Sequence, residues 1–283
     1  MDKVIQWFPG HMAKAVRLIE ENLKLIDAVL YILDARIPEA SQNPELTRLV
    51  SRKPVLYILN KADLADPAAT AEWIKHFAES DTRAIPANAK ERQFVSATLK
   101  EIYTLCEEKI KSRELKGVKY LPRVMIVGIP NTGKSTLINT MCGSRRAVTG
   151  DKPGVTRGKQ WVSIDGKAEL LDTPGVLPPK FESQLSARRA ALAGCVGDKA
   201  VDPVGLAAAL FSDIIALYPE AVSKYGITLT GNFSEDITAA ARALNYALSG
   251  GEPDIERTAL RILDDYRKGK LGRMTFERVN NES

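Results

Sequence analysis

One segment constrains the fold of this 283-residue chain more than any other: Gly128-Ile129-Pro130-Asn131-Thr132-Gly133-Lys134-Ser135. It matches the pattern GxxxxGKS and lies between a short apolar run, Val124 to Val127, and a helical pattern, Lys134 to Cys142. In this arrangement the glycines let backbone N–H groups surround phosphates at the N-terminus of a helix. The segment predicts a P-loop and a nucleoside triphosphate ligand, but alone it does not identify the base. We expect phosphate contacts from Gly128, Asn131, Thr132, Gly133, Lys134, Ser135 and Thr136.

The pattern around this segment predicts a doubly wound α/β sheet that extends to about Gly175. Asp27 to Leu33 and Val55 to Leu59 are short apolar runs, each followed by a polar loop and a helical pattern, which is typical of buried parallel strands. A hairpin is expected at Asp165-Gly166, joining Gln160–Ile164 to Lys167–Leu171. Further helices are expected over Pro67–Glu79 and Arg92–Lys111, and a basic, helix-breaking connector over Lys109–Arg123.

After Pro178-Pro179 the pattern becomes helical. Amphipathic helices are expected over Ser183–Gly194, Pro203–Leu217, Ser234–Leu248 and Ile255–Lys268. The sequence thus predicts two domains, an α/β domain over residues 1–178 and a small all-helical domain over residues 179–283.

Composition excludes several classes of protein. No apolar run reaches the roughly 18 residues of a membrane span, and the N-terminus lacks the apolar core of a secretory signal. We therefore expect a cytoplasmic protein with no membrane partner. Three scattered cysteines favour neither a disulfide framework nor a zinc site. A net charge of +5 favours a polyanionic partner.

Asn60-Lys61-Ala62-Asp63 closes the second apolar run and has the form of the guanine-specificity motif NKxD. Asp63 would accept hydrogen bonds from guanine N1–H and the 2-amino group, and adenine offers neither donor. Asn88-Ala89-Lys90 resembles the weaker SAK motif, in which the alanine N–H contacts guanine O6. We therefore expect the base to be bound by Asn60, Lys61, Asp63, Asn88 and Ala89.

Asp172-Thr173-Pro174-Gly175 resembles the DxxG motif of GTPases. Its aspartate would hold Mg²⁺ through water, and the Gly175 N–H would sense the γ-phosphate. Pro153-Gly154-Val155-Thr156 lies between this motif and the P-loop, as a switch with a magnesium-binding threonine does. The predicted magnesium site is therefore Ser135, Thr156 and Asp172.

The guanine motif precedes the P-loop by about seventy residues, whereas it follows the P-loop in ordinary GTPases. Four features together resemble the bacterial ribosome-biogenesis GTPase A family. They are this circularly permuted order, the helical last third, and the segments Trp7-Phe8-Pro9-Gly10-His11-Met12-Ala13-Lys14-Ala15 and Asp34-Ala35-Arg36-Ile37-Pro38. The resemblance covers essentially the whole chain. It implies a permuted P-loop GTPase sheet with a small helical C-terminal domain.

In function, the resemblance implies a GTPase that binds GTP and GDP. It would bind the immature large ribosomal subunit, through rRNA and ribosomal proteins, and leave after hydrolysis in a late assembly step. We expect a monomer off the ribosome. Basic residues recur over Lys109–Arg123, over residues 145–159 and over residues 257–278, which suits phosphate contacts with rRNA, although solvated faces explain single residues equally well.

Catalysis needs a group that activates water. Val176 and Leu177 follow Gly175 where Ras-like GTPases place a glutamine, and an aliphatic side chain cannot hold water. His11 is our candidate catalytic residue, on its position before the first strand and on the family resemblance; a helix-capping or RNA-facing role is the alternative. Asn131 matches the position that binds K⁺ in potassium-activated GTPases, so K⁺ is a second expected cofactor beside Mg²⁺.

Two other classes of protein stay open on the sequence. A P-loop ATPase or small-molecule kinase would leave Asp63 without a role. A tRNA-modification or signalling GTPase would keep the nucleotide site but would not sediment with ribosomal subunits.

Overall fold

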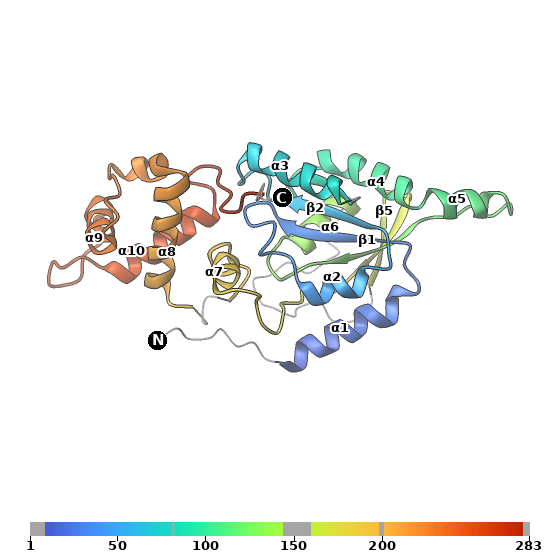
Figure 1. Ribbon diagram of the computed structural model, residues 1–283, viewed down its shortest axis with the longest axis horizontal. Coiled ribbons are helices and arrows are strands. Elements are labelled where there is room, and N and C mark those ends of the chain that lie inside the picture. The colour runs from blue at the N-terminus through green and yellow to red at the C-terminus, as the bar shows by residue number, and fades with distance from the viewer. Residues whose placement is uncertain (1–8, 81, 144–159, 198–200, 280–283) are drawn as a thin grey trace.

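The computed structural model describes residues 9–80, 82–143, 160–197 and 201–279, with the backbone alone for residues 9–12 and 160. A six-stranded sheet has the order β3-β2-β1-β4-β6-β5, in which only β5 is antiparallel to its neighbour (Figure 1). The strands are β1 (Ala28–Asp34), β2 (Val55–Asn60), β3 (Arg83–Ala87), β4 (Arg123–Val127), β5 (Gln160–Ile164) and β6 (Ala168–Asp172). The predicted α/β sheet and its hairpin are confirmed.

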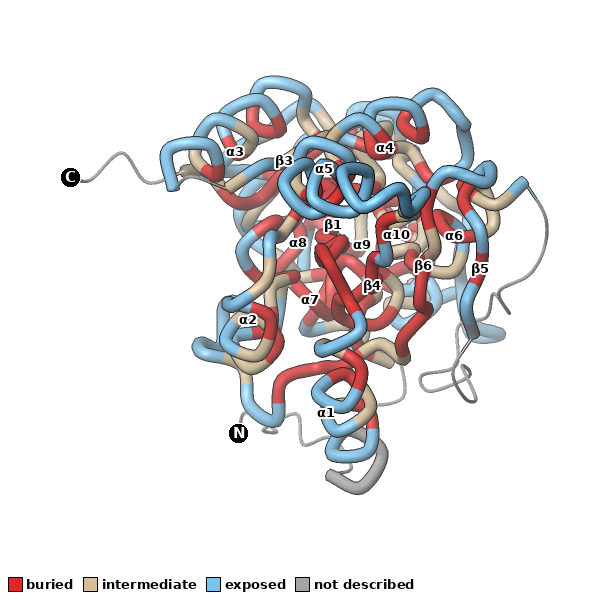
Figure 2. The backbone as a smooth tube through the Cα atoms, turned by 90° about the vertical axis from the view of Figure 1, so that its right-hand side faces the viewer, coloured by how far each residue is buried: buried red, intermediate tan, exposed pale blue. Residues whose placement is uncertain are grey.

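Helices cover both faces of the sheet, so its inner strands are buried, whereas the edge strands β3 and β5 are partly exposed (Figure 2). Alternate residues of β1 point to opposite faces. Leu30 and Ile32 pack with α4 (Gln93–Leu105), α5 (Glu107–Glu114) and α6 (Lys134–Cys142). Val29 and Tyr31 pack with α1 (Pro9–Leu23), α2 (Pro44–Val50) and α3 (Pro67–Glu79). This is the doubly wound arrangement.

The chain after the sheet is helical. In Figure 1 its helices α8, α9 and α10 lie at the left, and α7 lies between them and the sheet. Its elements are α7 (Gln184–Leu192), α8 (Pro203–Leu217), the 3₁₀ helix η2 (Pro219–Tyr225), α9 (Phe233–Ala243) and α10 (Ile255–Arg267). Like α3, α8 begins with an aspartate cap and a proline: Asp202 accepts from the N–H of Val204 at 3.0 Å. The helical core includes Ile129 and Leu177 from the α/β part.

Within the described ranges no single helix is long and apolar enough to cross a membrane. Of the helices in the described part of the chain, α8 and η2 pass on length and composition, and only together, as a pair bent by 119°.

The last described residues, 272–279, return to the α/β part, and we call them the C-terminal strap. The Met274 N–H donates to the carbonyl of Leu64 at 3.1 Å, and the Phe276 N–H to that of Arg36 at 3.1 Å. The strap therefore ties the end of the chain to the loops that follow β2 and β1.

Some sequence predictions of helices were wrong in extent. The helix expected over Arg92–Lys111 breaks at Cys106 (φ −105°), and α5 extends to Glu114, into the segment expected to be a helix-breaking connector. The helix expected to reach Leu248 ends at Ala243, because Asn245 (φ 55°) has a left-handed backbone that stops it. The helical pattern expected after the first strand, for which no bounds were predicted, is α2 (Pro44–Val50). Helix α1 and the strap were not predicted from the sequence.

Candidate nucleotide-binding site

The permuted motifs meet at one edge of the sheet. In the parallel register Asp34 pairs with Asn60, and Asn60 with Ala87. Tyr31 of β1 pairs with Val127, the last residue before the P-loop. Since parallel strands present their carboxyl ends at the same edge, chain order does not matter for assembling the site.

The P-loop encloses a buried lysine. The Lys134 Nζ donates to the carbonyls of Gly128 at 3.1 Å and Ile129 at 2.7 Å, and Lys134 is 7% exposed. Burial lowers the pKa of Lys134 to about 8, although the charge of Asp172 opposes the shift. Gly133 (φ 94°) is required at its position, because a Cβ would collide with the Asn60 amide.

The guanine motif is bonded to the P-loop. The Asn60 Nδ2 donates to the carbonyl of Thr132 at 2.7 Å, and its Oδ1 accepts from the Ala89 N–H at 3.0 Å. Ala89 therefore already uses the N–H expected to read guanine O6, and base binding requires that hydrogen to be shared or released. The Asp63 carboxylate lies 3.9 Å from the Lys90 Nζ at the mouth of the site.

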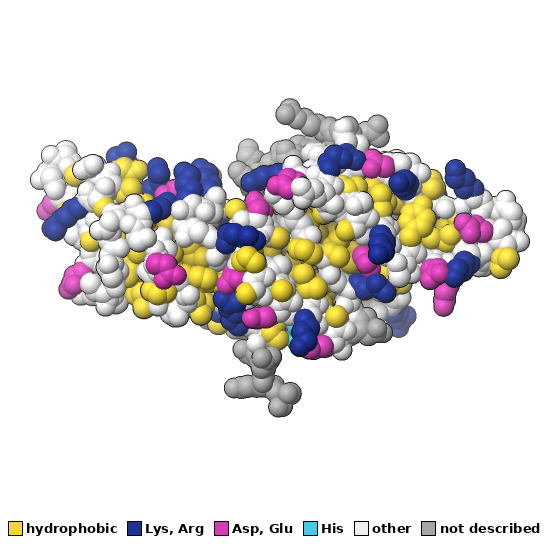
Figure 3. All heavy atoms as spheres, turned by 90° about the horizontal axis from the view of Figure 1, so that it is seen from above, with side chains coloured by type: hydrophobic (Ala, Val, Ile, Leu, Met, Phe, Trp, Pro, Cys, Tyr) yellow, Lys and Arg dark blue, Asp and Glu magenta, His cyan; other side chains and the backbone are white. Residues whose placement is uncertain are grey.

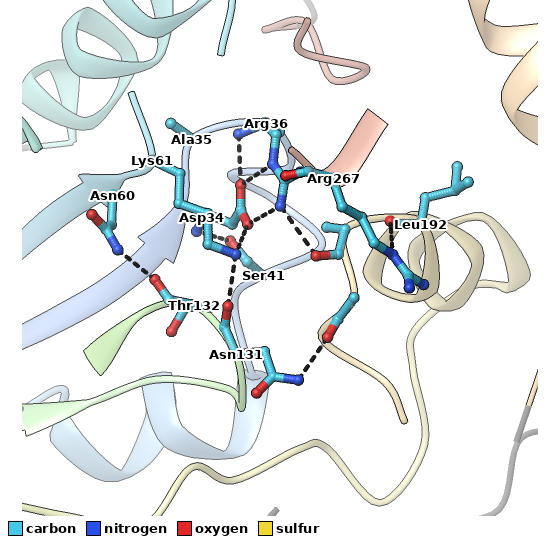
Figure 4. A network of polar contacts seen from close by, with 12 residues as sticks. Asp34, Ala35, Arg36, Ser41, Asn60, Lys61, Asn131, Thr132, Leu192 and Arg267 are labelled. Carbon is cyan, nitrogen blue, oxygen red and sulfur yellow. Dashed lines mark hydrogen bonds and ion pairs between the residues drawn. The ribbon is translucent and has the colours of Figure 1, made fainter. Parts of the chain in front are cut away.

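Asp34, which no sequence motif assigned to the site, organises these contacts (Figure 4). Its fully buried carboxylate accepts from the Arg36 Nη2 at 2.7 Å and pairs with the Lys61 Nζ at 2.8 Å. Burial would raise the pKa of Asp34, but the attraction of these two cations outweighs it and holds the pKa below its usual range. The Lys61 Nζ also donates to the carbonyl of Asn131 at 2.7 Å. The position of Asp34 at a strand end in register with Asn60 is the signal that identifies it.

Two of the three predicted magnesium ligands lie in the described part of the chain. Ser135 lies in the first turn of α6 and Asp172 ends β6, beside β4 in the sheet. A hydroxyl and a carboxylate are hard oxygen donors that suit Mg²⁺. Gly175 packs on the P-loop, since a Cβ there would lie 2.9 Å from both the Lys134 Nζ and the Pro130 nitrogen. Thr156 lies outside the described residues.

His11 lies in the first turn of α1, in a helix rather than a flexible segment, and its side chain is outside the described part of the chain. Its role as the catalytic residue stays a prediction.

A cavity of about 470 Å³ lies over the motifs. One side is formed by all the residues expected to bind the base and by three of those expected to bind the phosphates: Asn60, Lys61, Asp63, Asn88, Ala89, Asn131, Gly133 and Thr136. The opposite side is formed by residues of the helical part, none of which was predicted from the sequence: Ala193, Gly194, Val196, Gly197, Asp264 and Arg267. The Asn131 Nδ2 joins the two sides by donating to the carbonyl of Gly194 at 2.8 Å.

Comparison with known proteins agrees with this geometry. Residues 123–212 match the family described as 50S ribosome-binding GTPase. The chain is 42% identical to Ribosome biogenesis GTPase A of Bacillus cereus over 277 residues, covering 97% of this chain and 94% of that protein. It is 33% identical to the protein of the same name in Thermotoga maritima, covering 97% and 94%.

Solved structures show the same fold. The GDP-bound structure of TM YlqF has a TM-score of 0.68 and 30% identity, covering 94% of this chain and 100% of that one. GNP-bound YlqF from T. maritima has a TM-score of 0.67 and 31% identity, covering 94% and 98%. Because the similarity covers nearly the whole chain, it includes the helical part as well as the sheet. The chain is therefore a GTPase of ribosome biogenesis and belongs to the ribosome biogenesis GTPase A family.

Proposed function

We propose that this GTPase binds the immature large ribosomal subunit, hydrolyses GTP there during a late assembly step, and is released as a monomer with GDP. The family description and the names of the relatives support a ribosomal partner. The observation that carries the proposal is the cavity shared by the nucleotide motifs and the helical part. A nucleotide in such a cavity influences the position of the helical part, and therefore the surface offered to the subunit.

We assign residues 1–178 to the GTPase domain and residues 179–283 to a ribosome-binding domain. The chain runs from the γ-phosphate sensor Gly175 directly toward α7. The Val176 N–H donates to the carbonyl of Gly128 at 3.2 Å, and its carbonyl accepts from the Asn43 Nδ2 at 2.9 Å. Ordering of this segment by the γ-phosphate would thus act on both the P-loop and the helical domain.

The RNA-binding surface in this proposal is extended. Lys and Arg side chains are spread along the face seen in Figure 3, from the helical part to α5. Some basic residues of the C-terminal third instead have internal partners: the Arg267 Nε donates to the carbonyl of Leu192 at 3.1 Å, and Lys270 pairs with Asp265 at 3.3 Å. RNA contacts are therefore better sought among exposed residues such as Arg242 and Arg257. The Arg257 guanidinium lies 4.1 Å from the centre of the Tyr246 ring but is not paired with an acid among the residues that the structure describes.

Sedimentation with purified large subunits tests the proposal. We expect the protein to pellet with immature large subunits in a non-hydrolysable GTP analogue and to remain in the supernatant in GDP. Binding should weaken steeply with salt, and Arg242→Ala with Arg257→Ala should reduce the slope by about one unit for each phosphate that the variant no longer binds. Equal binding in both nucleotides, or none at low salt, would contradict the proposal.

For hydrolysis we propose Mg²⁺ at Ser135, Thr156 and Asp172, K⁺ at Asn131, and water activation by His11. Val176 and Leu177 are 0% and 2% exposed and packed in apolar clusters, which supports a water-activating group from elsewhere. The Asn131 Nδ2 bond to Gly194 leaves Oδ1 as the side-chain atom suited to a cation.

Turnover measurements test these roles. His11→Ala should keep GTP affinity but lower subunit-stimulated turnover by roughly 10²- to 10⁴-fold, or less if His11 only orients water. His76→Ala is the matched control and should have no effect. Turnover in K⁺ should exceed turnover in Na⁺, and Asn131→Ala should abolish that difference. Normal stimulated turnover of His11→Ala would leave K⁺ or an RNA group as the source of catalysis.

A further inference from the structure

The nucleotide cavity carries an acidic side chain with no role in the motifs. Asp264, in the last turn of α10, lines the same cavity as the guanine motif. Its side chain is 45% exposed, and one carboxylate oxygen, Oδ2, pairs with the Lys268 Nζ at 2.8 Å. A solvated ion pair alone would account for these contacts. The cavity wall in which Asp264 sits is, however, fixed against the site at several points.

The carboxyl end of α10 is held against the guanine-motif loop. Gly269 (φ 72°) follows the helix and approaches Leu64 so closely that a Cβ would lie 2.6 Å from the Leu64 Cδ2. The Arg273 Nε donates to the carbonyl of Ala65 at 2.8 Å. The left-handed backbone at this position favours glycine, and together with the Arg273 bond it gives Asp264 a defined position relative to the base pocket.

The neighbouring part of the wall is fixed by two arginines. Arg36 donates to the carbonyl of Ala193 at 3.1 Å, and Arg267 to those of Ala191 at 3.0 Å and Leu192 at 3.1 Å. These bonds satisfy the carbonyls of Leu192 and Ala193 at the carboxyl end of α7, which otherwise lack a helical partner. They add a second donor to the carbonyl of Ala191, which already accepts from the Gly194 N–H at 3.0 Å. The wall is therefore preorganised for a ligand.

The chemistry of a guanine nucleotide restricts what Asp264 can contact. A carboxylate repels the phosphates, which the P-loop binds, and Asp63 already accepts from the donor edge of the base. The ribose hydroxyls are the remaining donors of the nucleotide, and they lie between base and phosphates. We infer that Asp264 accepts a hydrogen bond from a ribose hydroxyl, so that the helical part selects ribonucleotides over deoxyribonucleotides.

Calorimetric titration of GDP, 2′-deoxy-GDP and 3′-deoxy-GDP into the full chain tests this inference. The wild type should bind GDP about tenfold or more tightly than at least one deoxy analogue, as expected for a hydrogen bond to a charged acceptor. Asp264→Ala should weaken GDP binding to the level of that analogue and remove the preference. Asp264→Asn, which keeps a neutral acceptor, should be intermediate.

Two controls separate this role from a structural one. Lys268→Ala removes the same ion pair but keeps the carboxylate, so the preference for GDP should persist. Glu256→Ala removes an exposed carboxylate from the first turn of α10, outside the cavity lining, and should change nothing. An unchanged GDP to deoxy-GDP ratio in Asp264→Ala, or no preference in the wild type, would overturn the inference. Neither result depends on ribosome binding.

Discussion

Among single residues, Lys134 links nucleotide binding to pH. Its pKa is lowered to about 8 by burial, and bound phosphates would raise it again by stabilising the charged form. Below pH 8 the lysine is already protonated, whereas above pH 8 binding must take up a proton. GDP affinity should therefore fall as pH rises above about 8.

Calorimetry in buffers of different ionisation enthalpy measures how many protons are taken up when GDP binds. The uptake should be clearly larger at about pH 8.5 than at about pH 7. Lys134→Arg stays charged at both pH values and should show no difference. If the wild type shows the same small uptake at both, the pKa of Lys134 is not lowered in the free protein.

Among the structural elements, the C-terminal strap contains a buried acid. Glu277 accepts from the N–H of Glu39 at 2.6 Å and of Ala40 at 3.1 Å, and the carbonyl of Glu277 accepts from the Trp73 Nε1 at 3.0 Å. Burial raises the pKa of Glu277 to about 7, and Arg189, 3.6 Å away, only partly opposes it. Once the Glu277 carboxyl group ionises, its burial therefore destabilises the folded state.

The sign of the pH dependence follows from this pKa. Between about pH 4.5 and pH 7 the folded state binds more protons at Glu277 than the unfolded state does, so its contribution to the free energy of unfolding decreases as pH rises. Urea unfolding of wild type and Glu277→Gln across this range should show a difference that changes by up to roughly 1.4 kcal/mol per pH unit. A difference independent of pH would mean that the carboxyl group has its ordinary pKa when folded.

Across the molecule, the two predicted domains share a core. Ile37, Ile129 and Leu177 of the α/β part pack in the same cluster as Phe211 and Tyr266 of the helical part. The strap adds backbone hydrogen bonds between the two parts. Because the helical part completes its core with side chains of the α/β part, we expect one cooperative unfolding transition.

The tryptophans make this testable. Trp7, Trp73 and Trp161 all precede residue 178, so their fluorescence reports on the α/β part and, through the Trp73 bond to Glu277, on the strap. Far-ultraviolet circular dichroism reports on all helices. The two urea transitions should coincide, with and without GDP. Separated midpoints would instead make residues 1–178 and 179–283 independent folding units.

The chemistry of the nucleotide motifs, the doubly wound sheet and the family could all be predicted from the residues alone. The P-loop and Asn60-Lys61-Ala62-Asp63 are recognisable because each depends on a few residues adjacent in the chain, between a strand and a helix. The same locality explains why α3 and α8 were predicted at their observed bounds, since each begins at a cap followed by proline.

The closure of the site, in contrast, became visible only in three dimensions. Asp264 and Gly194 face the motifs across a cavity from distant parts of the chain, and no local pattern distinguishes them from other helix-end residues. The strap has no regular secondary structure, and its bonds to loop carbonyls follow from where the helical part is packed. Such contacts depend on how buried faces pack together rather than on spacing along the chain, so local signals in the sequence could not specify them.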